Sequence, residues 1–396
     1  MDPVIVDMRG RRIDIRGDND GIKPYVYVCV VASVSIILGF IWDISWHMSI
    51  GRDRFFTPPH CFIYAGAVIA GCFSGYQVLR ISFWGTPAEK AGSIKFWGIF
   101  YSSLGGLLCI WGAMAMLTSA PFDNWWHNTY GLDTKIFSPP HTLLLTGMIT
   151  IQIGAYVSVV AAGAGKTFDA KTTKKHNWIF AIAAGSVLST LFTLFTELLE
   201  PSLMHSIGFY EAAGLIFPVY LLAVSRASKT KWGATAASAV FMAEMIFMVW
   251  VLELVPAKPL LGPVFNHFDH YQPFRFPLLL IFPAMVIDII NNKLKNQSIW
   301  LVAPATALAF LLVILPVQWY FGTFYHTSVY SRGWVFASYS LNYGTNPGRE
   351  YRYTFNPALV DTGWRLVIGL FFAYCLALVS SFLGYLWGGW IRKVQR

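Results

Sequence analysis

The sequence predicts an all-α protein, a polytopic transmembrane helical bundle of about ten spans arranged as hairpins. Hydrophobic residues make up 56% of the 396 residues and charged residues only 12%, whereas a soluble domain carries about 25% charged residues. Apolar runs of roughly 20 residues recur along the chain, as a helix that crosses a bilayer requires. The runs are continuous, whereas the strands of a membrane barrel would alternate over about ten residues. This composition excludes a soluble enzyme, a disordered chain and a secreted disulfide scaffold.

The lysines and arginines predict the orientation of the spans. If the N-terminus is cytoplasmic, most of the 29 basic residues fall in the cytoplasmic segments, and an even number of spans returns the C-terminus to the same side. The net charge of +9 then reflects topology, with the lipid bilayer as partner and no nucleic acid. We expect a bacterial inner (cytoplasmic) or intracytoplasmic membrane. The predicted spans are about 25–47, 61–80, 96–117, 141–163, 178–199, 208–225, 233–255, 276–291, 298–321 and 365–390.

Two segments on the predicted outer side resemble each other. The first, DISWHMSIGRDRFFTPPH, covers residues 43–60, and the second, DNWWHNTYGLDTKIFSPPH, covers residues 123–141. Each begins with Asp, has His four residues later, and ends in Thr or Ser followed by Pro-Pro-His. The two copies are about 80 residues apart, which is the length of a two-span hairpin.

This spacing has a structural meaning. Asp and His four residues apart lie on one face of a helix, so Asp43 with His47 and Asp123 with His127 can each reach one ion. Thr57 and Ser138 are candidate caps of the returning helix, and the prolines suit its first turn. His60 and His141 then fall near the Asp–His pairs. The sequence therefore predicts two Asp-His-His metal sites with open coordination positions.

The residue types narrow the choice of metal. Imidazole-rich sites without thiolate suit copper, zinc or iron, and affinity rises toward Cu(II). The five cysteines form no CxxC pair, so a zinc–thiolate site or structural disulfides are not expected. The competing interpretation is structural, because Asp, Trp and His also serve as interfacial anchors and helix caps. The duplicated third histidine favours metal binding.

The two segments resemble the third subunit of the copper-dependent membrane monooxygenases, the particulate methane and ammonia monooxygenases. The string WHMSIGRDRFFTPPH is similar to the most characteristic stretch of that family, in which an Asp and two histidines hold one metal. The family's second site uses Asn, His and a His fourteen residues further on. Here Asp123 stands in place of that Asn.

The resemblance covers residues 25–165, which we take as a metal-binding membrane core. Residues 1–24 form a predicted cytoplasmic N-terminal segment. Residues 166–396 form additional membrane helices with an extracytoplasmic loop at 322–364, and they match no part of the monooxygenase chain. What the resemblance implies is a copper centre that activates O₂ and oxidises a short hydrocarbon or ammonia. It also implies an electron donor and further subunits or a homo-oligomer.

Further polar residues are weaker candidates. Glu197, Glu200 and His205 surround the next outer turn and could be degenerate copies of the motif. Glu244 and Asp288 lie within predicted spans, where carboxylates are costly. These two raise a transporter as one alternative. The other is a copper-handling or scaffold protein without oxygenase activity, and the sequence names no catalytic residue.

Overall fold

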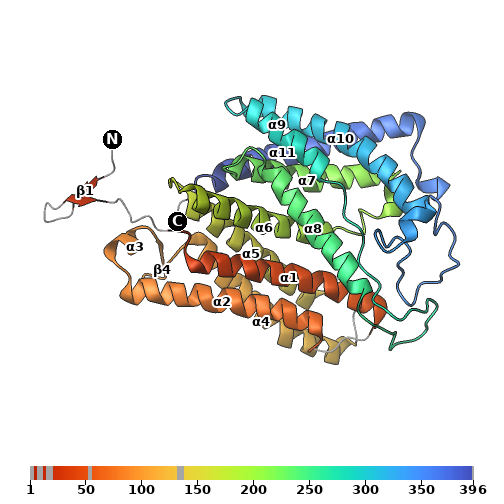
Figure 1. The fold of residues 1–396 in the computed structure, drawn as a ribbon, viewed down its shortest axis with the longest axis horizontal. Helices are drawn as coiled ribbons and strands as arrows, with labels where there is room; N and C mark the ends of the chain where they lie inside the picture. Colours follow the sequence, from red (N-terminus) through yellow and green to blue (C-terminus); the bar gives the residue numbers. More distant parts are fainter. Residues whose placement is uncertain (1–3, 7–11, 15–20, 52–55, 132–137, 395–396) are drawn as a thin grey trace.

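The chain folds as an integral membrane protein made almost entirely of helices. The computed structural model describes residues 4–6, 12–14, 21–51, 56–131 and 138–394. Within these ranges, nine helices are long and apolar enough to cross a membrane. They are α1 (Pro24–Ser49), α2 (Pro58–Trp84), α4 (Leu104–Tyr130), α5 (Pro139–Gly163), α6 (Ala170–Leu194), α7 (Ile207–Ala227), α8 (Gly233–Glu253), α10 (Ile299–Thr327) and α11 (Gly363–Ile391). The start of α1 and the end of α11 lie at the same end of the bundle (Figure 1).

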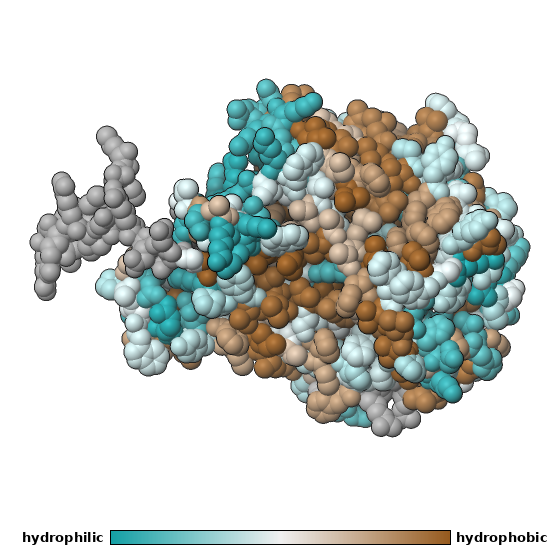
Figure 2. Space-filling view, in the orientation of Figure 1, coloured by the Kyte–Doolittle hydropathy of each residue, from teal (hydrophilic) through white to brown (hydrophobic). Residues whose placement is uncertain are grey.

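The surface has the distribution expected of a protein in a bilayer. Figure 2 shows apolar residues gathered over the middle of the visible face and hydrophilic residues toward the two ends. Large apolar side chains are widely exposed, such as Leu312 and Phe371. In water such a surface would be an aggregation hazard, whereas lipid tails solvate it.

Two duplicated hairpins, α1–α2 and α4–α5, form one half of the bundle. Helix α2 also packs against α4, and α5 packs against α1, so the four helices close into a square. Small residues allow close approach within each hairpin, as is usual between membrane helices. A Cβ atom built on Gly66 would lie 2.8 Å from the Ala32 carbonyl oxygen. At the equivalent place in the second hairpin, a Cβ on Gly147 would lie 2.7 Å from the Gly112 carbonyl oxygen.

The other helices pack beside this square. Helix α6 contacts both α5 and α1, and α8 lies against α6. Helix α7 pairs closely with α11, and α10 packs against α11 and α9 (Ile281–Lys293). Figure 1 shows α7, α9, α10 and α11 together on the side away from α2 and α4.

The eighth predicted span differs from expectation. Helix α9 has only 13 residues, too few to cross a bilayer by itself. The Tyr271 amide bonds to Val255 at one end of α8, and Asp288 bonds to Ala234 at the other, so residues 271–293 return along α8 partly as extended chain. Non-helical backbone is tolerated at membrane depth where protein surrounds it. Gln318, which is fully buried, accepts from the Leu279 amide in this segment.

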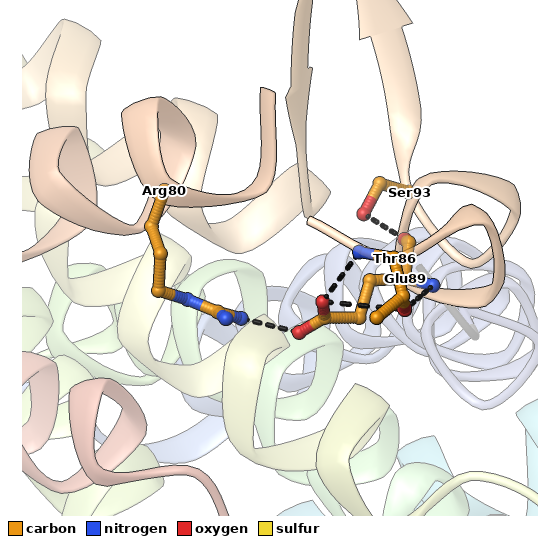
Figure 3. A network of polar contacts seen from close by, with 4 residues as sticks. All are labelled: Arg80, Thr86, Glu89 and Ser93. Carbon is orange, nitrogen blue, oxygen red and sulfur yellow. Dashed lines mark hydrogen bonds and ion pairs between the residues drawn. The ribbon is translucent and has the colours of Figure 1, made fainter. Parts of the chain in front are cut away.

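The third predicted span begins later than its apolar run. Residues 94–102 form the hairpin β3 (Ile94–Phe96) and β4 (Phe100–Ser102) rather than helix, and α4 starts at Leu104. The short helix α3 (Pro87–Ala91) precedes the hairpin, and Figure 3 shows its capping box. The Thr86 amide donates to Glu89, the Glu89 amide donates to the Thr86 hydroxyl, and Arg80 pairs with Glu89. The Arg80 hydrogen bond holds the pKa of Glu89 below its usual value.

Two long connections cover the outer end of α1. The Leu260 amide donates to the Ile50 carbonyl, and the Tyr343 amide donates to the Met48 carbonyl. The buried Ser49 hydroxyl accepts from the Gln272 amide. Residues from the second half of the chain therefore hold the end of α1 in place (Figure 1). The remaining short elements are strands β1 (Val4–Val6) and β2 (Arg12–Asp14) and the 3-10 turns η1 (Pro201–Leu203), η2 (Val329–Arg332) and η3 (Pro357–Leu359).

We predict that Gly66→Ala destabilises the protein and Gly75→Ala does not. A methyl at Gly66 would meet the Ala32 carbonyl and Ile36, whereas nothing lies within 4 Å of a Cβ at Gly75 in the same helix. Overpacking of this kind costs about 1–3 kcal/mol. Thermal unfolding of the two purified variants in detergent measures the difference, and equal midpoints would contradict the close-approach account.

Candidate metal centre

The two Asp–His pairs lie at the ends of the first helix of each hairpin. Asp43 and His47 are one turn apart near the end of α1, and Asp123 and His127 occupy the same place on α4. The His47 Nε2 atom is 3.8 Å from Asp43 Oδ2, and the His127 Nε2 atom is 3.4 Å from Asp123 Oδ2. The predicted placement of each pair on one helix face is therefore present in both copies.

The third residue of each set comes from the returning helix. Pro58 and Pro59 open α2, and His60 follows in its first turn. The Thr57 hydroxyl accepts from the His60 amide, as a capping residue does. Ser138 occupies the equivalent position before α5, but its side chain makes no capping bond. Only one of the two predicted caps is thus formed by a side chain.

Each aspartate faces both histidines of its set. The His60 Nε2 atom lies 3.3 Å from Asp43 Oδ1, and the His141 Nε2 atom lies 3.4 Å from Asp123 Oδ1. In the second set, one ligand atom from each of the three residues lies within 4.8 Å of the others. Among the described residues, it is the only trio of His, Cys, Asp or Glu side chains that close.

The carboxylates have an incomplete set of hydrogen bonds. Within the described part of the chain, the buried Oδ1 atoms of Asp43 and Asp123 accept no hydrogen bond, although a histidine nitrogen lies near each. A buried carboxylate oxygen without a hydrogen bond is costly. A cation between the carboxylate and the imidazoles would satisfy it, so the residues present fit a metal ion.

A glycine turn orients one of the imidazoles. The His127 Nδ1 atom lies 3.2 Å from the Gly131 carbonyl oxygen, and its Nε2 atom faces Asp123. Metal-binding histidines commonly donate their second ring nitrogen to such an acceptor, which fixes the tautomer. Gly131 has φ +88° and ψ 174°, a conformation essentially restricted to glycine. Our motif search missed Gly131, and its signal is a glycine four residues after the motif histidine.

Aromatic residues from both halves of the chain surround the first site. Tyr271 packs edge-on against Trp42 and lies beside Trp46, so it contacts the residues that flank Asp43 and His47. His60 lies against Tyr64. The ligand side chains remain partly open, with His47 34% exposed and Asp43 17% exposed. The site is therefore reachable from one end of the bundle.

The residues of the next outer turn do not form a third set. Glu197 is exposed, and Glu200 is paired with Arg275. His205 is stacked between Trp319 and Phe355, with ring centroids 4.2 and 3.9 Å away, and burial lowers its pKa. These contacts indicate packing roles.

The two carboxylates within the predicted spans also have local partners. Glu244 accepts hydrogen bonds from Ser186 and Ser189 of α6, each 2.6 Å long. Asp288 is fully buried and accepts from the amides of Ala234 and Thr235, which open α8. Glu244 therefore joins two helices, and Asp288 caps a third.

We predict that Gly131→Ala weakens metal binding at the second site about 10–100-fold, because the His127 ring loses its acceptor. Gly165→Ala is the matched control, since Gly165 also has positive φ but lies beyond the far end of α5. Titration of each purified variant with Cu(II) or Co(II) measures the affinity. Equal affinities in the two variants would show that Gly131 does not orient the ligand.

Comparison with known proteins adds no assignment to this geometry. No family model matches the chain, and neither a curated protein nor a solved structure does.

Proposed function

We propose that this protein binds metal ions at two membrane-embedded sites, one formed by Asp43, His47 and His60 and the other by Asp123, His127 and His141. The observation that carries the proposal is the repeated convergence of one carboxylate and two imidazoles, with ligand atoms within 4.8 Å in the second set. Chance placement of polar residues would not repeat the same trio in two hairpins.

Copper is the metal that we propose, with zinc and iron as alternatives. One carboxylate and two imidazoles without a thiolate suit all three, and Cu(II) binds such ligands most tightly. Asp123 and Asp43 each add one negative charge, which favours a divalent ion over a monovalent one.

The reaction that we propose is the oxidation of a small substrate with O₂, because residues 43–60 resemble the copper membrane monooxygenases. Bound copper would supply O₂ activation. The chain's own part is to fix the ligand side chains, as Gly131 does for His127, and to limit water around them, as Tyr271 does beside Trp46. A short hydrocarbon or ammonia could reach the sites from the bilayer. Electrons must come from a donor protein, and further subunits or a second copy of the chain could complete the assembly.

A copper-handling or scaffold role is the second candidate. The partial exposure of the ligands supports it, since His47 and His141 are 34% and 28% exposed and could exchange an ion with a partner. A transporter is a weaker candidate, because the contacts of Glu244 and Asp288 favour helix packing.

We expect the purified protein to contain bound metal, with copper above zinc and iron, and each of His47→Ala and His127→Ala to remove the ion from its own site. Elemental analysis of the proteins after dialysis gives the metal content. His267→Ala is the control, because it removes an exposed imidazole of the connection that covers α1. Bound metal that survives both site substitutions would refute the proposed ligands.

If the metal is catalytic, copper-loaded protein given a reductant should consume O₂ faster when a short alkane or ammonia is added. An oxygen electrode measures this rate. The rate should fall about tenfold or more in His47→Ala or His127→Ala, as loss of a metal ligand's function does, and stay unchanged in His267→Ala. Metal binding without substrate-dependent uptake would support the copper-handling role instead.

A further inference from the structure

Two cysteines far apart in the sequence occupy equivalent positions in the duplicated hairpins. Cys29 is the sixth residue of α1, and Cys109 is the sixth residue of α4. Their separation of 80 residues is the same as that between Asp43 and Asp123. Both thiols are fully buried.

The arrangement of the four helices explains why these residues meet. Helices α1 and α4 lie at opposite corners of the square, because each packs against α2 and α5. An approximate two-fold axis that runs along the bundle relates one hairpin to the other. Equivalent side chains that point toward this axis approach each other across it, and Cys29 and Cys109 are such a pair.

The surroundings place both thiols at the centre of the square. The Cys29 Sγ atom lies 3.5 Å from the Ser74 hydroxyl of α2, and the Cys109 thiol donates to the Ile151 carbonyl of α5 at 3.7 Å. Each thiol is also the principal polar neighbour of the other. All four helices therefore contribute to one small thiol site.

We propose that Cys29 and Cys109 form a disulfide that joins α1 to α4. In this step the two thiols lose two protons and two electrons, and one S–S bond forms. Molecular oxygen, which is small and apolar, can accept both and become hydrogen peroxide. A disulfide suits the site better than a metal–thiolate complex, because apolar surroundings disfavour the thiolates that a metal needs.

The cross-link would act on the candidate metal centre from a distance. Cys29 and Cys109 each lie fourteen residues before the aspartate of their helix, which is about 21 Å along the axis. A bond between α1 and α4 would limit the sliding of one hairpin against the other. The bond forms on the thiols alone, so it does not depend on the proposed metal.

The test uses the full-length protein in detergent, oxidised with air and lipid-soluble copper phenanthroline. After denaturation and alkylation, intact mass should show five alkyl groups on the reduced chain and two fewer on the oxidised chain. A digest of the oxidised protein should contain a linked peptide with Cys29 and Cys109. Cys29→Ser and Cys109→Ser should each keep all their remaining thiols alkylated.

Cys61→Ser and Cys72→Ser are the matched controls, because these cysteines are exposed. Both controls should still lose two alkyl groups on oxidation. Full alkylation of the oxidised wild-type chain would overturn the proposal, as would a loss that persists in Cys29→Ser and Cys109→Ser.

Discussion

The close approach of the two helices in each duplicated hairpin is the constraint on which the candidate metal centre depends. Where Gly66 faces the Ala32 carbonyl, and where Gly147 faces the Gly112 carbonyl, the two backbones touch. The end of one helix therefore lies beside the start of the next. Without that approach, the Asp43 carboxylate would reach His47 on its own helix but not His60.

A second constraint is that lipid offers no hydrogen bonds to an open backbone group. Polar side chains inside the bundle meet this need: Gln318 serves the extended segment before α9, Asp288 the start of α8, and Asp361 the Ile207 amide at the start of α7. In contrast, Oδ1 of Asp43 and of Asp123 accepts no hydrogen bond from any described residue. This difference is why we assign Asp288 to capping and the two motif aspartates to metal binding.

Sequence patterns predicted the long helices well, because an unbroken apolar run of bilayer length has few other stable structures in lipid. The failures occurred where tertiary contacts overrode that pattern. Residues 94–102 pair as a hairpin despite their apolar character. The eighth span is only partly helical because neighbouring helices satisfy its extended backbone. The cysteines were judged by local spacing, and the 80-residue offset that relates them was applied only to the aspartates and histidines.

The sequence by itself determined the membrane class and the composition of each Asp-His-His set, since both follow from hydropathy and from spacing along a helix. Only the tertiary structure decided which of the polar residues converge. His60 and His141 reach their aspartates because two helices pack closely, and Glu200 and His205 do not join them because Arg275, Trp319 and Phe355 hold them elsewhere. The physical reason is that helical periodicity acts over a few residues, whereas these contacts depend on the packing of separate helices.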